Sequence, residues 1–166
     1  TEIYTLSLHD ALPIWLVAIA TGDKVAAMAE VNIETDFAAK NEKFVAFARE
    51  MADAALSGGA AIVESDANKT KVTELVAAIG ENVNLRRAVK LTVSQGTVAG
   101  YMHSAAAPNL GRIGVLVALE SSAPADKLAE LGKQIAMHIA AAKPEALSRD
   151  QVDSSALERE RAVLTE

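Results

Sequence analysis

Hydrophobic and polar residues alternate near the start of the chain, a pattern that is typical of β-strands. Residues 16–20 are apolar, and residues 24–33 carry apolar side chains at every second position. Thr21-Gly22-Asp23 lies between the two segments and is a turn signal. Together they predict a β-hairpin.

From Phe44 onward the apolar period changes to three and four residues, which predicts an amphipathic α-helix. The residues that set this period are Phe44, Phe47, Ala48, Met51, Ala52 and Ala55. Ser57-Gly58-Gly59 is expected to end the helix. A shorter helix is predicted over Thr70–Ile79, with Gly80 at its end.

The chain alternates again over Leu85–Val93, which predicts a strand with Val89, Leu91 and Val93 on one face. Gln95-Gly96 is expected to form a turn, so that residues 97–104 pair back on this strand. Residues 113–119 are almost continuously apolar, which favours a strand covered on both faces.

An amphipathic helix is predicted over Ala125–Ala142, and Pro144 is expected to stop it. Its predicted inner face consists of Leu128, Leu131, Ile135, Ile139 and Ala142. Two capping-box patterns follow, Ser148-x-x-Gln151 and Ser155-x-x-Glu158. The second opens a charged helix without a strong apolar stripe, so we expect that helix to project into solvent or to meet another segment.

These elements combine into an α+β fold, an antiparallel sheet with helices packed on it. Residues 1–14 do not fit this plan, because they resemble one reading frame of a common DNA-sequencing adaptor translated in error. We therefore treat them as a non-native segment and leave them out of the fold reasoning. The native sequence then starts at about Trp15 or Leu16; the alternative is an ordinary divergent N-terminus.

The composition narrows the class of protein. The formal net charge of −6 argues against direct binding of nucleic acid and leaves open a partner with basic patches. The chain has no cysteine, which excludes disulfides, thiolate catalysis and cysteine zinc sites. No apolar run approaches the ~18 residues of a membrane span. We therefore expect a cytoplasmic protein with no membrane partner.

Four sequence blocks carry a family resemblance. They are Glu30-Val31-Asn32-Ile33-Glu34-Thr35-Asp36-Phe37, Gly80-Glu81-Asn82-Val83-Asn84-Leu85-Arg86-Arg87, Gly111-Arg112-Ile113-Gly114-Val115-Leu116-Val117 and Gln134-Ile135-Ala136-Met137-His138-Ile139-Ala140-Ala141. In order and spacing these blocks resemble the elongation factor Ts family, and four in order are far more specific than one. The resemblance covers nearly everything from about Leu16 to Glu166.

The resemblance implies an elongation factor Ts core-like fold that is truncated at both ends. Residues 15–143 correspond to the N-terminal core subdomain and its following helix. Residues 144–166 correspond to a connector and the start of a helix that leads to a second subdomain. The family's N-terminal helical domain and dimerisation hairpin have no counterpart in this sequence, so a homodimer is expected only in the full-length protein.

Members of the family bind the GTPase elongation factor Tu and accelerate release of its GDP during translation elongation. The resemblance therefore implies a guanine-nucleotide exchange factor that is not an enzyme and has no cofactor or metal of its own. The chain lacks G-x-x-x-x-G-K-[ST] and G-x-G-x-x-G patterns, so we do not expect it to bind the nucleotide itself. Two alternatives stay open: a binding-only fragment without exchange activity, and an enzyme whose site no motif reveals.

Asp36 and Phe37 are the first candidate contact residues. In the family this pair is inserted near the switch region and magnesium site of the GTPase, where the apolar ring displaces the elements that hold the metal and the phosphates. The pattern alone favours structural roles: a helix N-cap for Asp36, and packing on the first turn of that helix for Phe37. The family resemblance favours the contact with the GTPase.

Further residues are implied by the resemblance as contacts with the GTPase: Ile113 and Gly114, within the segment Arg112-Ile113-Gly114, and Met137 and His138. Gly114 permits close approach of a partner's backbone, although a glycine in a strand also marks bulges. For His138 the alternative is a boundary residue at the margin of the helix stripe, which is the commoner role of a lone histidine there.

Other polar residues are assigned structural roles. Arg86 and Arg87 are adjacent on a predicted strand, where neighbouring side chains point to opposite faces, so we interpret them as structural or rim charges rather than a phosphate clamp. Asn82 and Asn84 are interpreted as turn residues. His103 and His138 are too far apart for a local metal motif.

Overall fold

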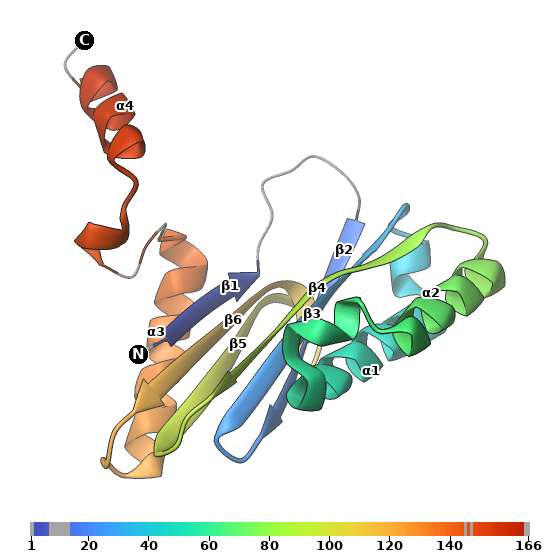
Figure 1. Cartoon of the computed structure of the whole chain (residues 1–166), viewed down its shortest axis with the longest axis horizontal. Helices are drawn as coiled ribbons and strands as arrows, with labels where there is room; N and C mark the ends of the chain where they lie inside the picture. Colours follow the sequence, from blue (N-terminus) through green and yellow to red (C-terminus); the bar gives the residue numbers. More distant parts are fainter. Residues whose placement is uncertain (1, 7–13, 145, 147, 165–166) are drawn as a thin grey trace.

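The computed structural model describes residues 2–6, 14–144, 146 and 148–164 (Figure 1). The strands and helices follow one another in the order β1 (Glu2–Leu6), β2 (Ile14–Gly22), β3 (Val25–Ile33), α1 (Glu42–Gly58), α2 (Asp66–Ile79), β4 (Val83–Thr92), β5 (Gly96–Ala107), β6 (Leu110–Glu120), α3 (Ala125–Ala142) and α4 (Ser154–Leu164). Short 3-10 turns lie at Ala38–Lys40, Gly59–Val63 and Arg149–Gln151. The α+β fold class is confirmed.

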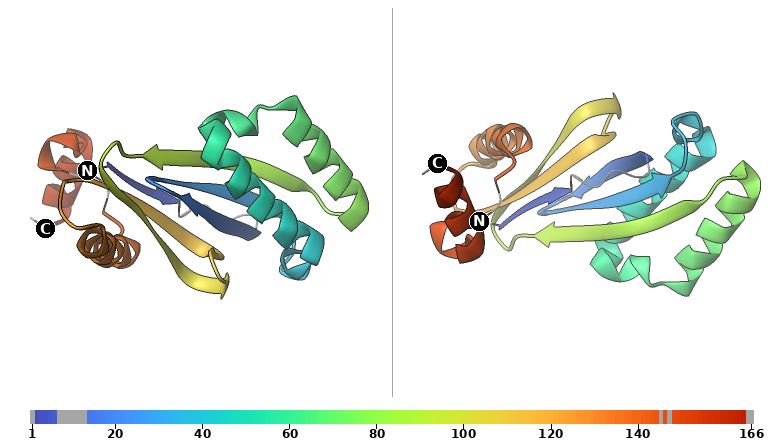
Figure 2. Two further views of the ribbon diagram at one scale, coloured as in Figure 1. Left: turned by 90° about the horizontal axis from the view of Figure 1, so that it is seen from below. Right: turned by 90° about the horizontal axis from the view of Figure 1, so that it is seen from above.

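The described strands form one antiparallel sheet in the order β1-β6-β2-β3-β4, with β5 on the other edge of β6. Figure 2 shows α1 and α2 beside the β2–β4 part of the sheet and α3 beside β5 and β6. The strand β1 comes from the segment predicted to be non-native, and it pairs with residues 114–118 of β6. Its pairing does not bear on the origin of the segment, which stays a prediction.

The first hairpin and first helix form the larger core. β2 and β3 pair from Ile14↔Ile33 to Gly22↔Val25, which confirms the predicted hairpin. Every residue that set the predicted helical stripe of α1 is buried, with Phe44 and Met51 fully so. Each large side chain buried in this way contributes ~1.5–3 kcal/mol, so this face alone holds α1 on the sheet.

The boundaries of the next two elements refine the prediction. The helix α2 starts at Asp66 rather than Thr70 and ends at Ile79, where Gly80 adopts the left-handed conformation with φ of 82°. β4 is a strand as predicted, but Asn84 lies inside it and is not a turn residue.

The predicted pairing of residues 97–104 with the preceding strand is wrong. β5 pairs with β6, from Gly96↔Glu120 to Ala107↔Leu110, while the partner of β4 is β3. The hairpin turn lies at Pro108-Asn109, where Asn109 adopts a φ of 57° that asparagine tolerates better than most residues. Gln95-Gly96 therefore does not form a hairpin turn between paired strands; it leads from β4 to β5, which pairs with β6.

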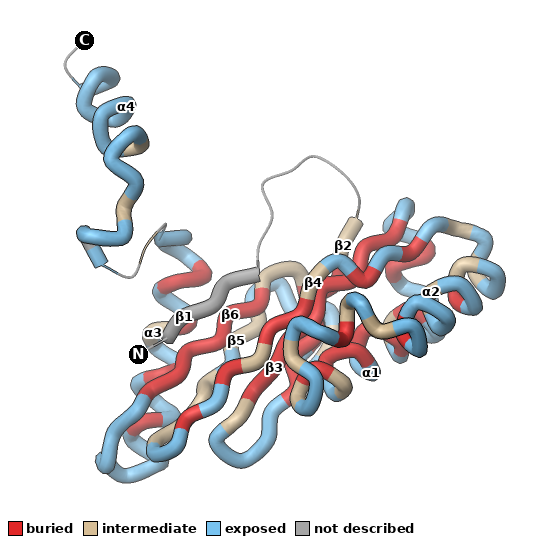
Figure 3. The backbone as a smooth tube through the Cα atoms, in the orientation of Figure 1, coloured by how far each residue is buried: buried red, intermediate tan, exposed pale blue. Residues whose placement is uncertain are grey.

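The strand β6 is buried on both faces, as its continuous apolarity predicts. Val115 and Val117 belong to the cluster under α3, whereas Leu116 and Ala118 belong to a cluster on the opposite face. Figure 3 shows β6 as a largely buried strand, and it lies between β5 on one edge and β1 and β2 on the other. It therefore supplies a rigid base for the residues at its start.

The helix α3 has the predicted bounds but a rotated inner face. Its buried residues are Leu128, Gly132, Ala136, Ile139 and Ala140. Leu131 is 48% exposed and Ala142 is exposed, so these two were placed wrongly on the inner face. The cause is close packing: a Cβ on Gly132 would lie 2.6 Å from Cβ of Ala99, so the helix turns its small residues toward β5.

Arg86 and Arg87 share one buried partner, which corrects the prediction that they point to opposite faces. Glu30 is fully buried; its Oε2 accepts from Nε of Arg87 at 2.7 Å, and Nη1 of Arg86 lies 3.7 Å from Oε1. The register between β3 and β4 shifts here, with Glu30↔Arg87 followed by Val31↔Leu85. This bulge puts both guanidinium groups on one side, where they neutralise a charge that is costly to bury alone.

The helix α4 begins at Ser154 and is capped by Asp153 rather than by the predicted Ser155. Oδ1 of Asp153 accepts from the backbone N–H of Ser155, and Oδ2 accepts from the Ser155 hydroxyl at 2.7 Å. The side-chain and then the backbone hydrogen bond lower the pKa of Asp153 below its usual value. No residue of α4 is buried over its described length, and the helix lies away from the sheet. Among the described helices, none is long and apolar enough to cross a membrane.

Gly132→Ala tests the close approach of α3 to β5. Helix propensity favours alanine by ~1 kcal/mol, whereas the added methyl meets Ala99 at 2.6 Å. Overpacking costs ~1–3 kcal/mol, so we expect a net loss of about 1 kcal/mol in the free energy of unfolding, measured by urea denaturation. The exposed neighbour Lys133→Ala serves as the control and should change it by less than about 0.5 kcal/mol. A stabilised Gly132→Ala variant would contradict the close packing.

Candidate partner-binding site

Phe37 stands in solvent at the end of the first hairpin, with 88% of its surface exposed. It lies four residues beyond Ile33, the last residue of β3, and directly precedes the turn Ala38–Lys40, whose first two residues are buried. The alternative that Phe37 packs on the first turn of the helix is therefore wrong. A large apolar side chain held out in water is the feature that needs a functional explanation.

The segment that carries Phe37 is braced by Glu81. The Glu81 carboxylate accepts from the backbone N–H of Thr35 at 3.0 Å and from its hydroxyl at 2.6 Å. Thr35 in turn accepts from the N–H groups of Ala38, at its hydroxyl, and Ala39, at its carbonyl. The preceding residue, Glu34, is also held, because its carboxylate accepts a hydrogen bond from the Asn82 side-chain amide. Phe37 therefore sits on a loop with little freedom to fold back.

Asp36 points to Arg112 of β6 rather than to a helix end. Its Oδ1 lies 2.9 Å from Nη2 of Arg112. The alternative of Asp36 as an N-cap is wrong, because Asn41 caps α1 by accepting from the N–H of Lys43. Both partners of the ion pair are well exposed, so it contributes at most ~1 kcal/mol to stability. Its structural effect is to link the Phe37 loop to the start of β6.

Arg112 is itself held by Trp15 of β2. Its Nη1 donates to the Trp15 carbonyl at 3.2 Å, and Nε1 of Trp15 donates to the Arg112 carbonyl at 2.8 Å. The guanidinium carbon lies 5.8 Å from the centroid of the indole ring, within the range of a cation–π contact. Arg112, Trp15 and Asp36 thus form one cluster that joins two strands to the loop.

Ile113 and Gly114 continue β6 beneath the surface. Ile113 is half-buried against the cluster under α3. Gly114 is buried, and a Cβ there would lie 2.7 Å from Cγ1 of Val17 and 3.1 Å from the sulfur of Met28. The pairing is regular at this position, so Gly114 does not mark a bulge. Glycine is required by packing within the chain, and the predicted contact of Gly114 with a partner stays a prediction.

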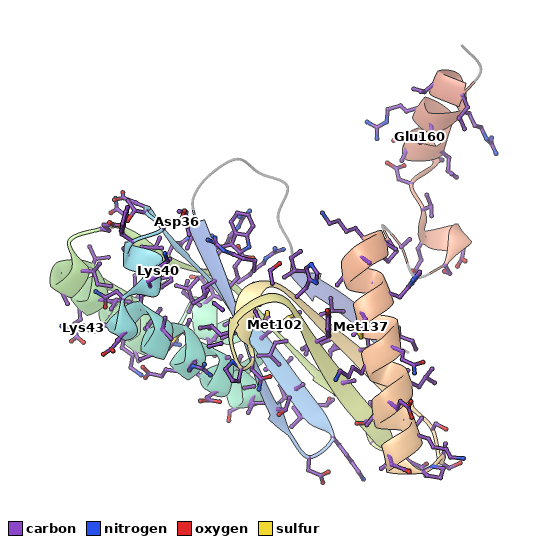
Figure 4. The ribbon with its side chains drawn as sticks, turned by 180° about the vertical axis from the view of Figure 1, so that it is seen from behind. Asp36, Lys40, Lys43, Met102, Met137 and Glu160 are labelled. Carbon is purple, nitrogen blue, oxygen red and sulfur yellow. The ribbon has the colours of Figure 1, made fainter. Side chains whose placement is uncertain are left out.

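Met137 and His138 lie on the outer side of α3. Met137 is 46% exposed and His138 is exposed, so His138 is not a boundary residue packed against the sheet. Figure 4 shows Asp36 beyond the end of the first hairpin and Met137 on α3 across the sheet, with Met102 of β5 between them in this view. The predicted contact residues therefore form two exposed groups, with Ile113 and Gly114 in the strand between.

Sequence reasoning did not predict the side-chain contacts that hold this surface in place. Thr35, Glu81 and Arg112 lie inside the matched blocks, but their patterns are those of ordinary turn and strand residues. Their roles depend on contacts that span long sequence separations, such as Thr35 with Glu81 and Asp36 with Arg112. Among the described residues, no group of three or more His, Cys, Asp or Glu side chains is suited to hold a metal ion.

Comparison with known proteins identifies the family. Residues 34–166 match the family profile described as Elongation factor TS. The chain belongs to the elongation factor Ts family. It is 49% identical to Elongation factor Ts of Sphingopyxis alaskensis, over 91% of this chain and 52% of that protein. It is 52% identical to the protein of the same name from Paramagnetospirillum magneticum, over 91% of this chain and 51% of that protein. It is 48% identical to the protein of the same name from Caulobacter vibrioides, over 91% of this chain and 52% of that protein.

The chain therefore spans about half the length of the curated elongation factor Ts proteins that it matches. The match covers the Phe37 loop, the start of β6 and the outer side of α3. The recognition of the family from four sequence blocks is confirmed.

Glu81→Ala tests the brace under the Phe37 loop. The change removes both acceptors of Thr35, so we expect a loss of about 1–2 kcal/mol in the free energy of unfolding, from two partly exposed hydrogen bonds. The N–H groups of Thr35 and Ala39 should exchange faster with deuterium, as measured residue by residue by NMR. Glu64→Ala, which removes an exposed ion pair with Lys69, is the control and should leave both rates unchanged. Unchanged exchange in the Glu81 variant would show that the brace does not hold the loop.

Proposed function

We propose that this chain binds elongation factor Tu and promotes release of its GDP, as a guanine-nucleotide exchange factor in translation elongation. The observation that carries the proposal is Phe37, 88% exposed on a braced loop within a chain of the elongation factor Ts family. The action is mechanical: the chain displaces parts of its partner and makes or breaks no covalent bond. Because translation takes place in the cytoplasm, the proposal assigns the chain to that compartment.

The proposed mechanism starts with insertion of Phe37 between side chains of the GTPase. Moving an exposed phenylalanine into a pocket contributes ~1.5–3 kcal/mol. The brace of Thr35 by Glu81 lowers the entropy that the loop loses on binding. The inserted ring then displaces partner elements that hold magnesium and phosphate, and a nucleotide site built on charge neutralisation weakens.

The remaining predicted contacts orient the insertion. Asp36, held by Arg112, presents a carboxylate beside the inserted ring. Met137 and His138 supply a second contact from α3, near the phosphate-binding loop of the GTPase. Ile113 and Gly114 of β6 supply a contact between these two groups, and the close fit of Gly114 against Val17 fixes the position of that part of the strand.

A binding-only role, without exchange activity, is the second candidate. In this role the chain would bind the GTPase with no effect on the rate of GDP release. An enzyme with an unrecognised site is a third candidate, which a chelator-sensitive activity of the isolated chain would support. A homodimer remains an expectation for the full-length protein only.

Phe37→Ala should lower the rate of GDP release and spare the fold. Truncation of a hot-spot side chain costs about 2 kcal/mol or more, which corresponds to roughly 30-fold in the accelerated rate. The free energy of unfolding should change by less than about 0.5 kcal/mol, because the side chain is exposed. Release of fluorescent GDP from elongation factor Tu measures the rate. Urea denaturation followed by circular dichroism measures the free energy of unfolding.

Val163→Ala is the matched control, because Val163 is 69% exposed on α4, outside the proposed surface. It should leave the rate of GDP release unchanged. Equal losses of rate and stability in the Phe37 variant would contradict the inserted-ring mechanism.

Excess GDP should dissociate the complex between this chain and elongation factor Tu. By linkage, a chain that weakens GDP binding must bind more weakly when GDP is present, by the same factor. Typical couplings of about 1–3 kcal/mol correspond to roughly 5–150-fold in affinity. Titration of the complex with GDP in a sedimentation or interferometry experiment measures this factor, and an affinity that is independent of GDP rules out exchange.

A further inference from the structure

We propose that Met137 of α3 is a site of reversible oxidation to methionine sulfoxide by hydrogen peroxide, and that the sulfoxide weakens the contact with elongation factor Tu. The second part rests on the proposed function, in which Met137 is a contact residue. The first part, selective oxidation of one methionine, depends only on this chain and needs no partner.

The four methionines of the chain differ in how far they are exposed. Met28 and Met51 are fully buried, whereas Met137 is 46% exposed. The sulfur of Met28 lies 3.1 Å from the position that a Cβ on Gly114 would take. Met51 lies on the inner face of α1, within the larger core. Hydrogen peroxide therefore reaches these two buried sulfurs only when the protein opens locally.

Met102 of β5 is intermediate between these cases. It is half-buried and packs against the buried cluster on the face of β6 that is opposite α3. A Cβ on Gly111 would lie 2.9 Å from its sulfur, so β6 lies against that sulfur. The chain has no cysteine, so no thiol competes for the oxidant. Met137 is thus the most exposed of the oxidisable sulfur-containing side chains.

The neighbours of Met137 leave its side chain open to solvent. Lys133 and Ala141, one turn before it and one turn after it on α3, are both exposed. Ala136 and Ala140, on the inner face of the helix, are buried and take part in the contact with the sheet. Oxidation of Met137 therefore changes the outer surface of α3 and leaves the core intact.

The oxidation transfers one oxygen atom and two electrons. A lone pair of the Met137 sulfur attacks one oxygen of hydrogen peroxide, so that an S–O bond forms and the O–O bond breaks. The other oxygen leaves as hydroxide and takes the proton of the transferred OH group, which gives methionine sulfoxide and water. The sulfur is oxidised and the peroxide is reduced. A methionine sulfoxide reductase reverses the change with electrons from a thiol, giving the thioether, a disulfide and water.

The sulfoxide changes the proposed contact because it converts an apolar side chain into a polar one. In the proposed complex, the exposed part of Met137 is buried against the GTPase. A sulfoxide oxygen would lose its water there, which is costly unless the partner supplies a hydrogen bond. The oxidised chain should therefore bind elongation factor Tu more weakly and accelerate GDP release less, and reduction should reverse both effects.

Selective oxidation is measured on the full chain by peptide mass spectrometry after timed exposure to hydrogen peroxide, stopped with catalase. We expect Met137 to react at least roughly tenfold faster than Met28 and Met51, because buried sulfurs react only through local opening. Met102 should fall between them. Circular dichroism should show an unchanged helix content when Met137 alone is oxidised. Oxidation of Met137 no faster than that of Met28 overturns the assignment of the site.

The effect on the partner is measured as the change in affinity for nucleotide-free elongation factor Tu on peroxide treatment, with the peroxide removed before the partner is added. The parent should bind roughly four- to tenfold more weakly after treatment, because about half of Met137 remains to be buried on binding. The two methionine sulfoxide reductases, one for each sulfoxide epimer, should restore the affinity in the presence of dithiothreitol.

Two variants locate the effect. Peroxide should not change the affinity of Met137→Leu, whereas the control Met102→Leu should respond to peroxide as the parent does. A Met137→Leu variant that still loses affinity on treatment overturns the inference. A parent whose affinity is unchanged by oxidation of Met137, alongside weak binding by Phe37→Ala, overturns the effect of the sulfoxide and leaves the proposed function intact. No binding by the untreated parent overturns the proposed function and, with it, the effect of the sulfoxide.

Discussion

The proposed function depends on one constraint, which is that Phe37 must stay in water on a loop that does not collapse. A free loop would bury the ring against the nearest apolar surface, and the buried residues Ala38 and Ala39 lie directly beside it. Polar contacts prevent this: Glu81 holds Thr35, and Arg112 holds Asp36. Each contact is individually weak, but together they define the direction in which the ring projects. The proposed binding surface is thus held in place within the chain itself.

The rest of the fold provides fixed points for these contacts. Arg112 is the third residue of a strand that is buried on both faces, and it exchanges hydrogen bonds with Trp15. Glu81 precedes β4, whose register is set by a bulge around the buried Glu30. Both anchors are therefore tied to the sheet and not to neighbouring loops. This explains why one end of the sheet is able to carry an exposed apolar side chain without losing its shape.

Local patterns predicted the elements well and their assembly less well. The first hairpin, α1 and the bounds of α3 follow from periodicity, because each depends on residues close in sequence. The inner face of α3 was misassigned because hydrophobicity favours Leu131, whereas close packing selects Gly132. The shared partner of Arg86 and Arg87 depends on a bulge, which periodicity cannot register. At the candidate site, the family resemblance pointed to Phe37, but the contacts that hold it in place join residues far apart in the chain.

The most direct test of the central claim is a fluorine NMR measurement on the full chain with fluorinated phenylalanine. The chain has three phenylalanines; Phe44 is fully buried and Phe47 is 5% exposed, so both are internal controls for Phe37. On addition of nucleotide-free elongation factor Tu, we expect the Phe37 signal alone to change its chemical shift, and excess GDP to restore it. A Phe37 signal that keeps its position while the chain is bound would contradict insertion of the ring into the partner.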